Sequence, residues 1–326
     1  MMEETELCFP QLFNSSCRKI RHPYYELLLM YIILFSIALL TVFLNLLVII
    51  SISHFRQLHT PTNILLLSLA VSDFLVGFIM IFQITLIEGC WFFGDMMCLL
   101  YNCLAYFITG ASIGTMVLIC VDRYVAICFP LHYSSKMTQK RVTICVWLCW
   151  TCAFIFQSLI QQDNLKQPGM YNSCVGECVV IISYIVGIAD LTVSFIVPIT
   201  VILVLYIRVF VVAVAQARAM RSQVATVVLR FSITAKKSEI KAARTLGVVV
   251  LVFVLCLCPF YFVALTGQDT LIQASSATFV VFLFYFNSSL NPIIYVFFYP
   301  WFRKSIRLIV TLRILQPDSS GISIMY

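Results

Sequence analysis

The sequence contains little charge. Only 11% of its 326 residues are Asp, Glu, Lys or Arg, whereas 62% are hydrophobic. Soluble globular proteins contain roughly 25% charged and about 45–50% apolar residues. The shortage of charge therefore excludes an ordinary water-soluble domain, because the excess apolar surface has to face lipid.

The sequence also lacks the motifs of several other protein classes. It has no phosphate-binding loop and no nucleophile beside a base, so we expect neither an enzyme nor a cofactor. Its four histidines are scattered, which argues against a metal centre. The sequence shows no internal repeat, which argues against a transporter built from two inverted halves. The first 26 residues hold four glutamates and no apolar core, unlike a cleavable signal peptide.

The chain does contain seven long apolar runs, and a membrane-spanning helix needs about 20 such residues. The predicted spans are 27–51, 62–86, 99–121, 143–162, 179–206, 245–266 and 274–298. We therefore predict an all-α membrane fold. It consists of an extracellular segment at 1–26, a seven-transmembrane helix bundle at 27–298, and a short cytoplasmic amphipathic helix with a tail at 299–326.

The basic residues indicate how this bundle is oriented. With the N-terminus outside, only Arg18, Lys19, Arg21 and Lys166 of the 21 Lys and Arg residues lie on the outer side. Cytoplasmic loops carry the excess of Lys and Arg in membrane proteins. We therefore predict a multi-pass plasma-membrane protein with an extracellular N-terminus. Topology and anionic membrane lipids explain the inner basic face, without nucleic acid.

The outer segments have the features of an extracellular surface. Asn14 begins an Asn-Ser-Ser sequon for glycosylation. Nine acidic residues against four basic ones favour the approach of cations. Outer cysteines favour disulfides because the extracellular space is oxidising, and the residues alone leave their pairing open. These cysteines are Cys8, Cys17, Cys90, Cys98, Cys174 and Cys178.

An ordered set of motifs runs through the predicted spans. They are Asn45, Asp73, Asp122-Arg123-Tyr124, Trp150, Pro198, Tyr206, Phe253, Pro259 and Asn291-Pro292-x-x-Tyr295. In this set the chain resembles the rhodopsin-like receptors that couple to G proteins. The resemblance implies that Arg123 pairs with Asp122 and Glu239 in the closed state. After opening, Arg123 would meet a heterotrimeric G protein while Tyr206 and Tyr295 fill the vacated space.

Further motifs are similar to those of trace amine-associated receptors. They are Asn287-Ser288-x-x-Asn291-Pro292-x-x-Tyr295-x-x-x-Tyr299-x-Trp301-Phe302, Cys174-x-Gly176-x-Cys178 and Cys90-Trp91-Phe92-Phe93-Gly94. Such receptors detect small amines, mostly in olfactory neurons, and usually raise cyclic AMP. The resemblance implies a disulfide between Cys98 and Cys178. It also implies a bond from Cys174 to the N-terminal segment, with Cys8 as the first choice and Cys17 as the alternative.

Asp73 is one of two acidic residues deep in the spans, where a charged side chain is costly and points to a function. By the resemblance, Asn45, Ser112, Asn287 and Asn291 converge near it. Carboxylate, hydroxyl and amide oxygens suit a hard cation, so a sodium ion near Asp73 is the one bound ion that we consider. The alternative is a protonated Asp73 within a structural hydrogen-bond network.

Asp190 is the other deep acid, and no Lys or Arg lies deep enough to pair with it. It lies about eleven residues into the fifth span, roughly 15 Å below the outer end, with Ser194 one turn further. A lone carboxylate at pocket depth is a natural counter-ion for a protonated amine. The alternatives are a receptor for a non-amine ligand with a protonated Asp190, and a transporter that uses Asp190 as a proton or cation relay.

Two positions depart from the family pattern. Ala105 stands where most amine receptors carry Asp in the third span, and Leu257 stands where the sixth span usually has Trp. Some trace amine-associated receptors, especially in fish, carry an Asp in the fifth span, and this chain resembles that subgroup. One acid favours a monoamine, although Glu88 and Glu177 leave a diamine open. The other pocket residues implied by the family pattern are Tyr106, Thr109, Phe260, Tyr261 and Tyr285.

Overall fold

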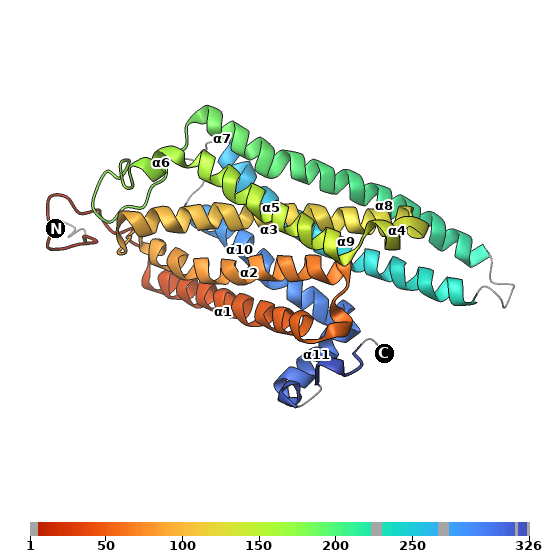
Figure 1. Cartoon of the computed structure of the whole chain (residues 1–326). Coiled ribbons are helices and arrows are strands. Elements are labelled where there is room, and N and C mark those ends of the chain that lie inside the picture. The colour runs from red at the N-terminus through yellow and green to blue at the C-terminus, as the bar shows by residue number, and fades with distance from the viewer. Residues whose placement is uncertain (1–5, 223–229, 267–273, 317–318, 325–326) are drawn as a thin grey trace.

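A computed structural model describes residues 6–222, 230–266, 274–316 and 319–324, with side chains placed except at 217, 219–244 and 264–278. Within these residues, seven helical segments are long and apolar enough to cross a membrane, which confirms the predicted all-α bundle (Figure 1). They are α1 (Tyr24–His54), α2 (Pro61–Thr85), α3 (Gly94–Cys128), α5 (Gln139–Ile160), the continuous α7 (Tyr184–Leu191), η3 (Thr192–Ile196) and α8 (Val197–Ser222), α9 (Arg230–Thr266) and α10 (Ala274–Phe298).

Short elements connect and follow the spanning helices. They are η1 (Arg56–Leu58), η2 (Leu86–Glu88), α4 (Pro130–Lys136), α6 (Gln162–Lys166), α11 (Pro300–Val310), η5 (Arg313–Leu315) and η6 (Ser319–Gly321). We call the end of the bundle that carries the disulfides the outer end, and the end next to α11 the inner end.

Helix α3 runs through the middle of the bundle and contacts α2, α5, α8 and α9 (Figure 1). Its contact with α5 is close because Gly114 has no side chain, and a Cβ there would overlap the sulfur of Cys149. Large apolar side chains such as Phe35 and Trp147 are exposed on the outside of the bundle. That surface suits lipid, in which helices satisfy their own backbone hydrogen bonds.

The fifth span begins at Tyr184 rather than at residue 179 as predicted. The apolar run 179–183 precedes the helix in an irregular conformation. Side-chain amides pair with its backbone instead: Asn164 donates to the carbonyl of Ile181 and Asn172 accepts from the Val179 amide. Asp190 therefore lies only about 9 Å below the start of the helix, not 15 Å.

The helix is distorted below Asp190. Residues of η3 (Thr192–Ile196) form a π-helical turn immediately before Pro198. Proline lacks an N–H and interrupts the hydrogen-bond ladder of a helix, and π turns are frequent at functional sites. The wider turn lies where Ser194 bonds to Asp190, at the cavity described below.

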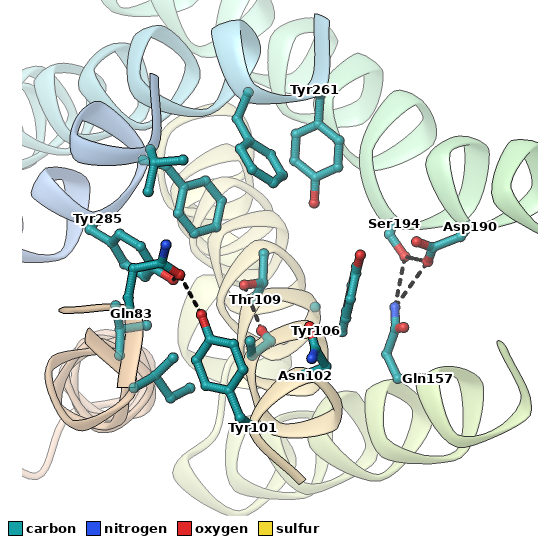
Figure 2. Close-up of a pocket in the computed structure, with 17 residues that line it drawn as sticks. Gln83, Tyr101, Asn102, Tyr106, Thr109, Gln157, Asp190, Ser194, Tyr261 and Tyr285 are labelled. Carbon is teal, nitrogen blue, oxygen red and sulfur yellow. Dashed lines mark hydrogen bonds between the residues drawn. The ribbon is translucent and has the colours of Figure 1, made fainter. Parts of the chain in front are cut away.

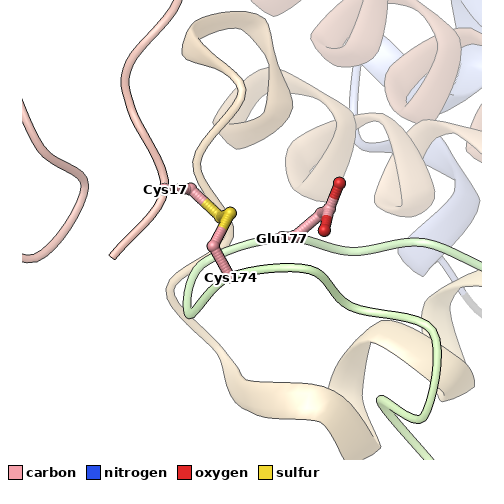
Figure 3. Close-up of side chains that lie close together, drawn as sticks. All are labelled: Cys17, Cys174 and Glu177. Atoms are coloured by element: carbon pink, nitrogen blue, oxygen red, sulfur yellow. A yellow bond between two sulfur atoms is a disulfide. The ribbon is translucent and has the colours of Figure 1, made fainter. Parts of the chain in front are cut away.

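Three disulfides tie the outer segments together. Cys98 is bonded to Cys178, as the resemblance implied. The first choice for Cys174 is wrong, because the structure joins it to Cys17 (Figure 3). The N-terminal segment pairs with the second outer loop beside this bond, since the Cys17 amide donates to the Val175 carbonyl at 3.0 Å. The remaining N-terminal cysteine, Cys8, is bonded to Cys90 in the first outer loop.

Glu177 lies close to the Cys17–Cys174 disulfide (Figure 3). A metal would need the thiolate form of both cysteines, which the disulfide removes. The Glu177 carboxylate instead accepts hydrogen bonds from the backbone and hydroxyl of Ser173, at 2.6 and 2.7 Å. This cluster therefore anchors a loop.

Helix α11 has one apolar and one basic face, as predicted. Trp301 and Phe302 are buried, whereas Arg303 and Arg307 are exposed. Arg303 also donates to the carbonyls of Val296 and Phe297, at 2.8 and 3.1 Å. These are unpaired carbonyls at the end of a helix, so the contact fixes the turn between α10 and α11.

We expect the cysteine pairs to behave as pairs in substitution experiments. Cys17→Ser and Cys174→Ser should each lower thermal stability by about 2–5 kcal/mol, and the double variant should be no worse than either, because the second thiol already lacks its partner. Cys8→Ser combined with Cys174→Ser should be worse than either alone. A Cys8–Cys174 peptide in a digest of unreduced protein would contradict this connectivity.

Candidate ligand-binding site

A cavity of about 180 Å³ opens in the outer half of the bundle (Figure 2). Its lining comes from α2, α3, α5, α7, η3, α9 and α10 and is rich in aromatic side chains. Such concave, mostly apolar sites with a few polar groups are typical of small-molecule pockets. All of the side chains predicted to form the pocket line it: Asp190, Ser194, Tyr106, Thr109, Phe260, Tyr261 and Tyr285.

Asp190 forms the acidic side of the cavity (Figure 2). Its Oδ1 accepts hydrogen bonds from the Ser194 hydroxyl at 2.8 Å and from Gln157 Nε2 at 3.0 Å. No Lys, Arg or His is among the lining residues. No described residue donates to Oδ2, so one carboxylate oxygen keeps its full acceptor capacity. The side chain is positioned by neutral donors while its charge stays uncompensated.

Gln157 is a site residue that the sequence analysis missed. It lies on α5 and is only 4% exposed, and its Nε2 also approaches the Ser194 hydroxyl at 3.3 Å. The signal for it was an amide side chain inside an otherwise apolar span, where an unpaired polar group is costly. Its amide fixes the orientation of the carboxylate from the α5 side.

Aromatic rings form the wall on the side of α9 and α10. Tyr261 stacks on Phe195 with ring centroids 4.0 Å apart, and Phe260 packs against Phe284 at 4.7 Å. Aromatic faces attract ammonium groups and pack against apolar chains. Leu257 is buried in the core and does not line the cavity.

Helix α3 contributes no carboxylate to the cavity. Ala105 lines it at the place of the usual Asp, and the Thr109 hydroxyl one turn below donates to the Ala105 carbonyl at 2.8 Å. On the side opposite Asp190, Tyr101 donates to Gln83 Oε1 (Figure 2). Tyr285 also donates to this oxygen, at 3.4 Å. The sequence analysis named Tyr285 but neither Gln83 nor Tyr101.

A second polar centre lies around Asp73, which is 1% exposed. Asn291 donates to Asp73 Oδ2 at 2.8 Å. Asn45 was also expected near Asp73, but its side-chain amide donates to the backbone carbonyls of Thr41 and Ser288 instead. Ser112 and Asn287 are also buried. The atoms without a donor among the described residues are the Oδ1 oxygens of Asn45, Asp73, Asn287 and Asn291.

The geometry agrees with comparisons to known proteins. Residues 44–295 match the family described as 7 transmembrane receptor (rhodopsin family). The chain belongs to this family. Trace amine-associated receptor 13c of Danio rerio is 38% identical over 331 residues, covering 99% of this chain and 97% of that protein. Trace amine-associated receptor 4 of Mus musculus is 37% identical over 334 residues, covering 98% and 96%. The molecule is therefore a receptor of the membrane and not an enzyme.

The inner end of this rhodopsin-family receptor holds Arg123 in a buried network. Arg123 Nε donates to Asp122 at 2.9 Å, and its Nη2 contacts Asp122 and Thr62. Tyr133 donates to the other oxygen of Asp122 at 3.0 Å. Burial and the Asp122 carboxylate raise the pKa of Tyr133, which keeps its phenol protonated as a donor. The side chain of Glu239, the predicted partner on α9, lies outside the described residues.

The other predicted switch tyrosines lie on α3, α8 and α10. Tyr295 is buried and packs edge-on against Tyr299, with ring centroids 5.7 Å apart. Tyr124 packs against Phe129 at the same distance. Tyr206 of α8 fits against Gly247 of α9, where a Cβ would overlap the Tyr206 hydroxyl oxygen.

The contact between Tyr206 and Gly247 leads to a stability prediction. Gly247→Ala should lower the thermal midpoint of the detergent-solubilised receptor, because overpacking typically costs about 1–3 kcal/mol. Adding Tyr206→Ala should recover much of the loss, since it removes the overlapping ring. Gly187→Ala is the matched control, because a Cβ at Gly187 meets nothing within 4 Å. An unchanged midpoint for Gly247→Ala would contradict the contact.

Proposed function

We propose that the chain is a plasma-membrane chemosensory receptor that binds a small protonated amine with Asp190 as counter-ion and activates a heterotrimeric G protein. The observation that carries the proposal is a carboxylate with no basic residue among its neighbours in the cavity. A cation bound there pairs with the charge that Ser194 and Gln157 leave uncompensated. The names of the relatives, which are trace amine-associated receptors, support the same ligand class.

The proposed anchor lies on the fifth span rather than the third. Ala105 faces the cavity from α3 and offers only a methyl group, so it cannot pair with an ammonium. Asp190 reaches the same cavity from α7. We therefore propose that the chain belongs to the fish-type subgroup with its amine-binding Asp in the fifth span.

The ligand that fits this arrangement is a monoamine. Glu88 does not line the cavity and lies 3.4 Å from Lys19, with Tyr31 donating to its other oxygen at 3.0 Å. Glu177 is also outside the cavity and is bonded to Ser173. Neither acid is available for a second ammonium group.

The proposed signal leaves through the inner end. Arg123 is held by Asp122 in the present arrangement, and its release would expose a buried cation to a partner. We propose a stimulatory or olfactory G protein as that partner, with a rise in cyclic AMP. The exposed Asn14 beside three disulfides supports an extracellular N-terminus, as does the concentration of basic residues at the other end.

We also propose that the polar centre holds a sodium ion. Buried oxygens without a donor suit a hard cation or ordered water, and the Oδ1 atoms of Asp73 and of its partner Asn291 are both of this kind, as is that of Asn287. The Asp73 carboxylate would supply the charge, and the Asn291 and Asn287 carbonyl oxygens would complete the coordination.

Replacing Asp190 tests the anchor. Cells expressing wild type, Asp190→Asn and Asp190→Ala would be screened with simple amines through a cyclic AMP reporter, with surface expression measured for each. Truncating one partner of a buried charge pair costs about 2–5 kcal/mol, so both variants should lose roughly 30-fold or more in potency.

Asp163→Asn is the matched control for this test. It removes the same charge from an exposed outer residue that pairs only with Lys166, so its amine response should equal that of wild type. Equal potency in all variants would remove Asp190 as the anchor. A wild type that ignores every amine would favour a non-amine ligand.

The sodium site can be tested without a ligand. Purified wild-type receptor should have a higher thermal midpoint in sodium chloride than in potassium chloride of equal concentration, because an ion that binds only the folded state stabilises it. Asp73→Asn should remove the difference by removing the charged ligand. If wild type shows the same midpoint in both salts, the centre is a hydrogen-bond network with a protonated Asp73.

A further inference from the structure

The cavity has a second polar side, opposite Asp190. Gln83 of α2, Tyr101 of α3 and Tyr285 of α10 meet there, and Figure 2 shows them across the cavity from Asp190. We call these three residues the neutral pole. The tyrosines are both buried, so the pole is part of the cavity wall and is shielded from bulk water.

The hydrogen bonds within the neutral pole leave a defined set of groups for a ligand. Both tyrosine hydroxyls donate to Gln83 Oε1, the Tyr285 bond being 3.4 Å long. Each hydroxyl has one proton, so both phenol oxygens keep lone pairs as acceptors. The Gln83 Nε2 has two N–H donors, and no described residue accepts from them. The pole therefore offers donors and acceptors together, without a formal charge.

These groups discriminate between the far ends of candidate ligands. A second ammonium would find acceptors but no carboxylate, and burying an unpaired charge is strongly unfavourable. A methyl group would leave the Gln83 amide protons without a partner. A hydroxyl can accept from Gln83 Nε2 and donate to a phenol oxygen, so it satisfies both kinds of group.

We propose that the ligand carries a neutral hydrogen-bonding group, such as a hydroxyl, at the end opposite its ammonium, and that Gln83, Tyr101 and Tyr285 bind this group. The inference rests on the proposed function, in which Asp190 binds the ammonium. It assigns to the receptor a class of amino alcohols in preference to simple alkylamines and diamines.

A purely structural role for the neutral pole makes a different prediction. The pole also joins α2, α3 and α10, so a substitution could weaken the response to every ligand by loosening the bundle. The readout that separates the two roles is a ratio. Binding at the pole changes the potency of an amino alcohol relative to an alkylamine of the same length, whereas a structural defect lowers both together.

The test compares alkylamines, terminal amino alcohols and terminal diamines of matched chain length on the wild type, Gln83→Leu, Tyr101→Phe and Gln83→Glu. In the wild type, the amino alcohol that best fits the cavity should be about tenfold more potent than the matching alkylamine, the gain expected from well-placed hydrogen bonds. Gln83→Leu should remove most of this advantage, so that the amino alcohol and the matching alkylamine become about equal in potency.

Gln83→Glu keeps the shape of the side chain and adds a carboxylate. It should raise the potency of the matching diamine by about tenfold or more, because the second ammonium then has a counter-ion. This gain of response remains informative where a loss variant folds poorly.

The possible results separate the inference from the function it rests on. Alkylamines that match the amino alcohols in potency on the wild type would overturn the inference alone. A preference for diamines would overturn the inference together with the proposed monoamine, and would leave an amine as the ligand. A loss in Gln83→Leu shared by all amines would show a structural role only. A wild type that ignores all three classes would overturn the proposed amine function together with the inference.

Discussion

The hydrocarbon core of a bilayer contains no water that could hydrogen-bond to a side chain, so every buried polar group needs a partner within the bundle. Asp190 meets this requirement only in part. Ser194 and Gln157 position one oxygen of its carboxylate, but neutral donors do not cancel a negative charge. In the proposed complex, the aromatic lining of the cavity would exclude water around the bound cation and pack against the apolar part of the ligand.

Three acids lie within the bundle, Asp122 and Asp73 buried and Asp190 half-buried at the cavity, and their partners separate two kinds of role. Asp122 has a cation, Arg123, together with donors from neighbouring side chains. The Asp122–Arg123 ion pair can form or break, but its carboxylate already has a cation and does not need a ligand. Asp73 and Asp190 have neutral partners only among the described residues. In the proposed function, these are the two places that bind an external cation, a small one at Asp73 and an organic one in the larger aromatic cavity.

Most of the fold could be predicted from the sequence because hydrophobicity acts locally along the chain. The exception is the start of the fifth span, where the run 179–183 is apolar but not helical, since Asn164 and Asn172 pair with its backbone. The acidic anchor could be predicted because a deep carboxylate is costly at any rotation of its helix. Gln157 and Gln83 could not, because an amide matters only through the helix faces it meets, and those are set by packing between distant spans.

The place of the anchor also bears on how binding is transmitted. In the proposed complex, the ammonium binds Asp190 of α7. This helix continues through the π-helical turn of η3 into α8. Helix α8 carries Tyr206, which fits against Gly247 of α9 with no space for a side chain. A shift of α8 therefore has to move α9 through this contact. Leu257, in place of the usual Trp, is buried away from the cavity, and the described α9 side chains that line the cavity are Phe260 and Tyr261. In the proposed complex, the contact between Tyr206 and Gly247 therefore joins the span that carries the anchor to α9.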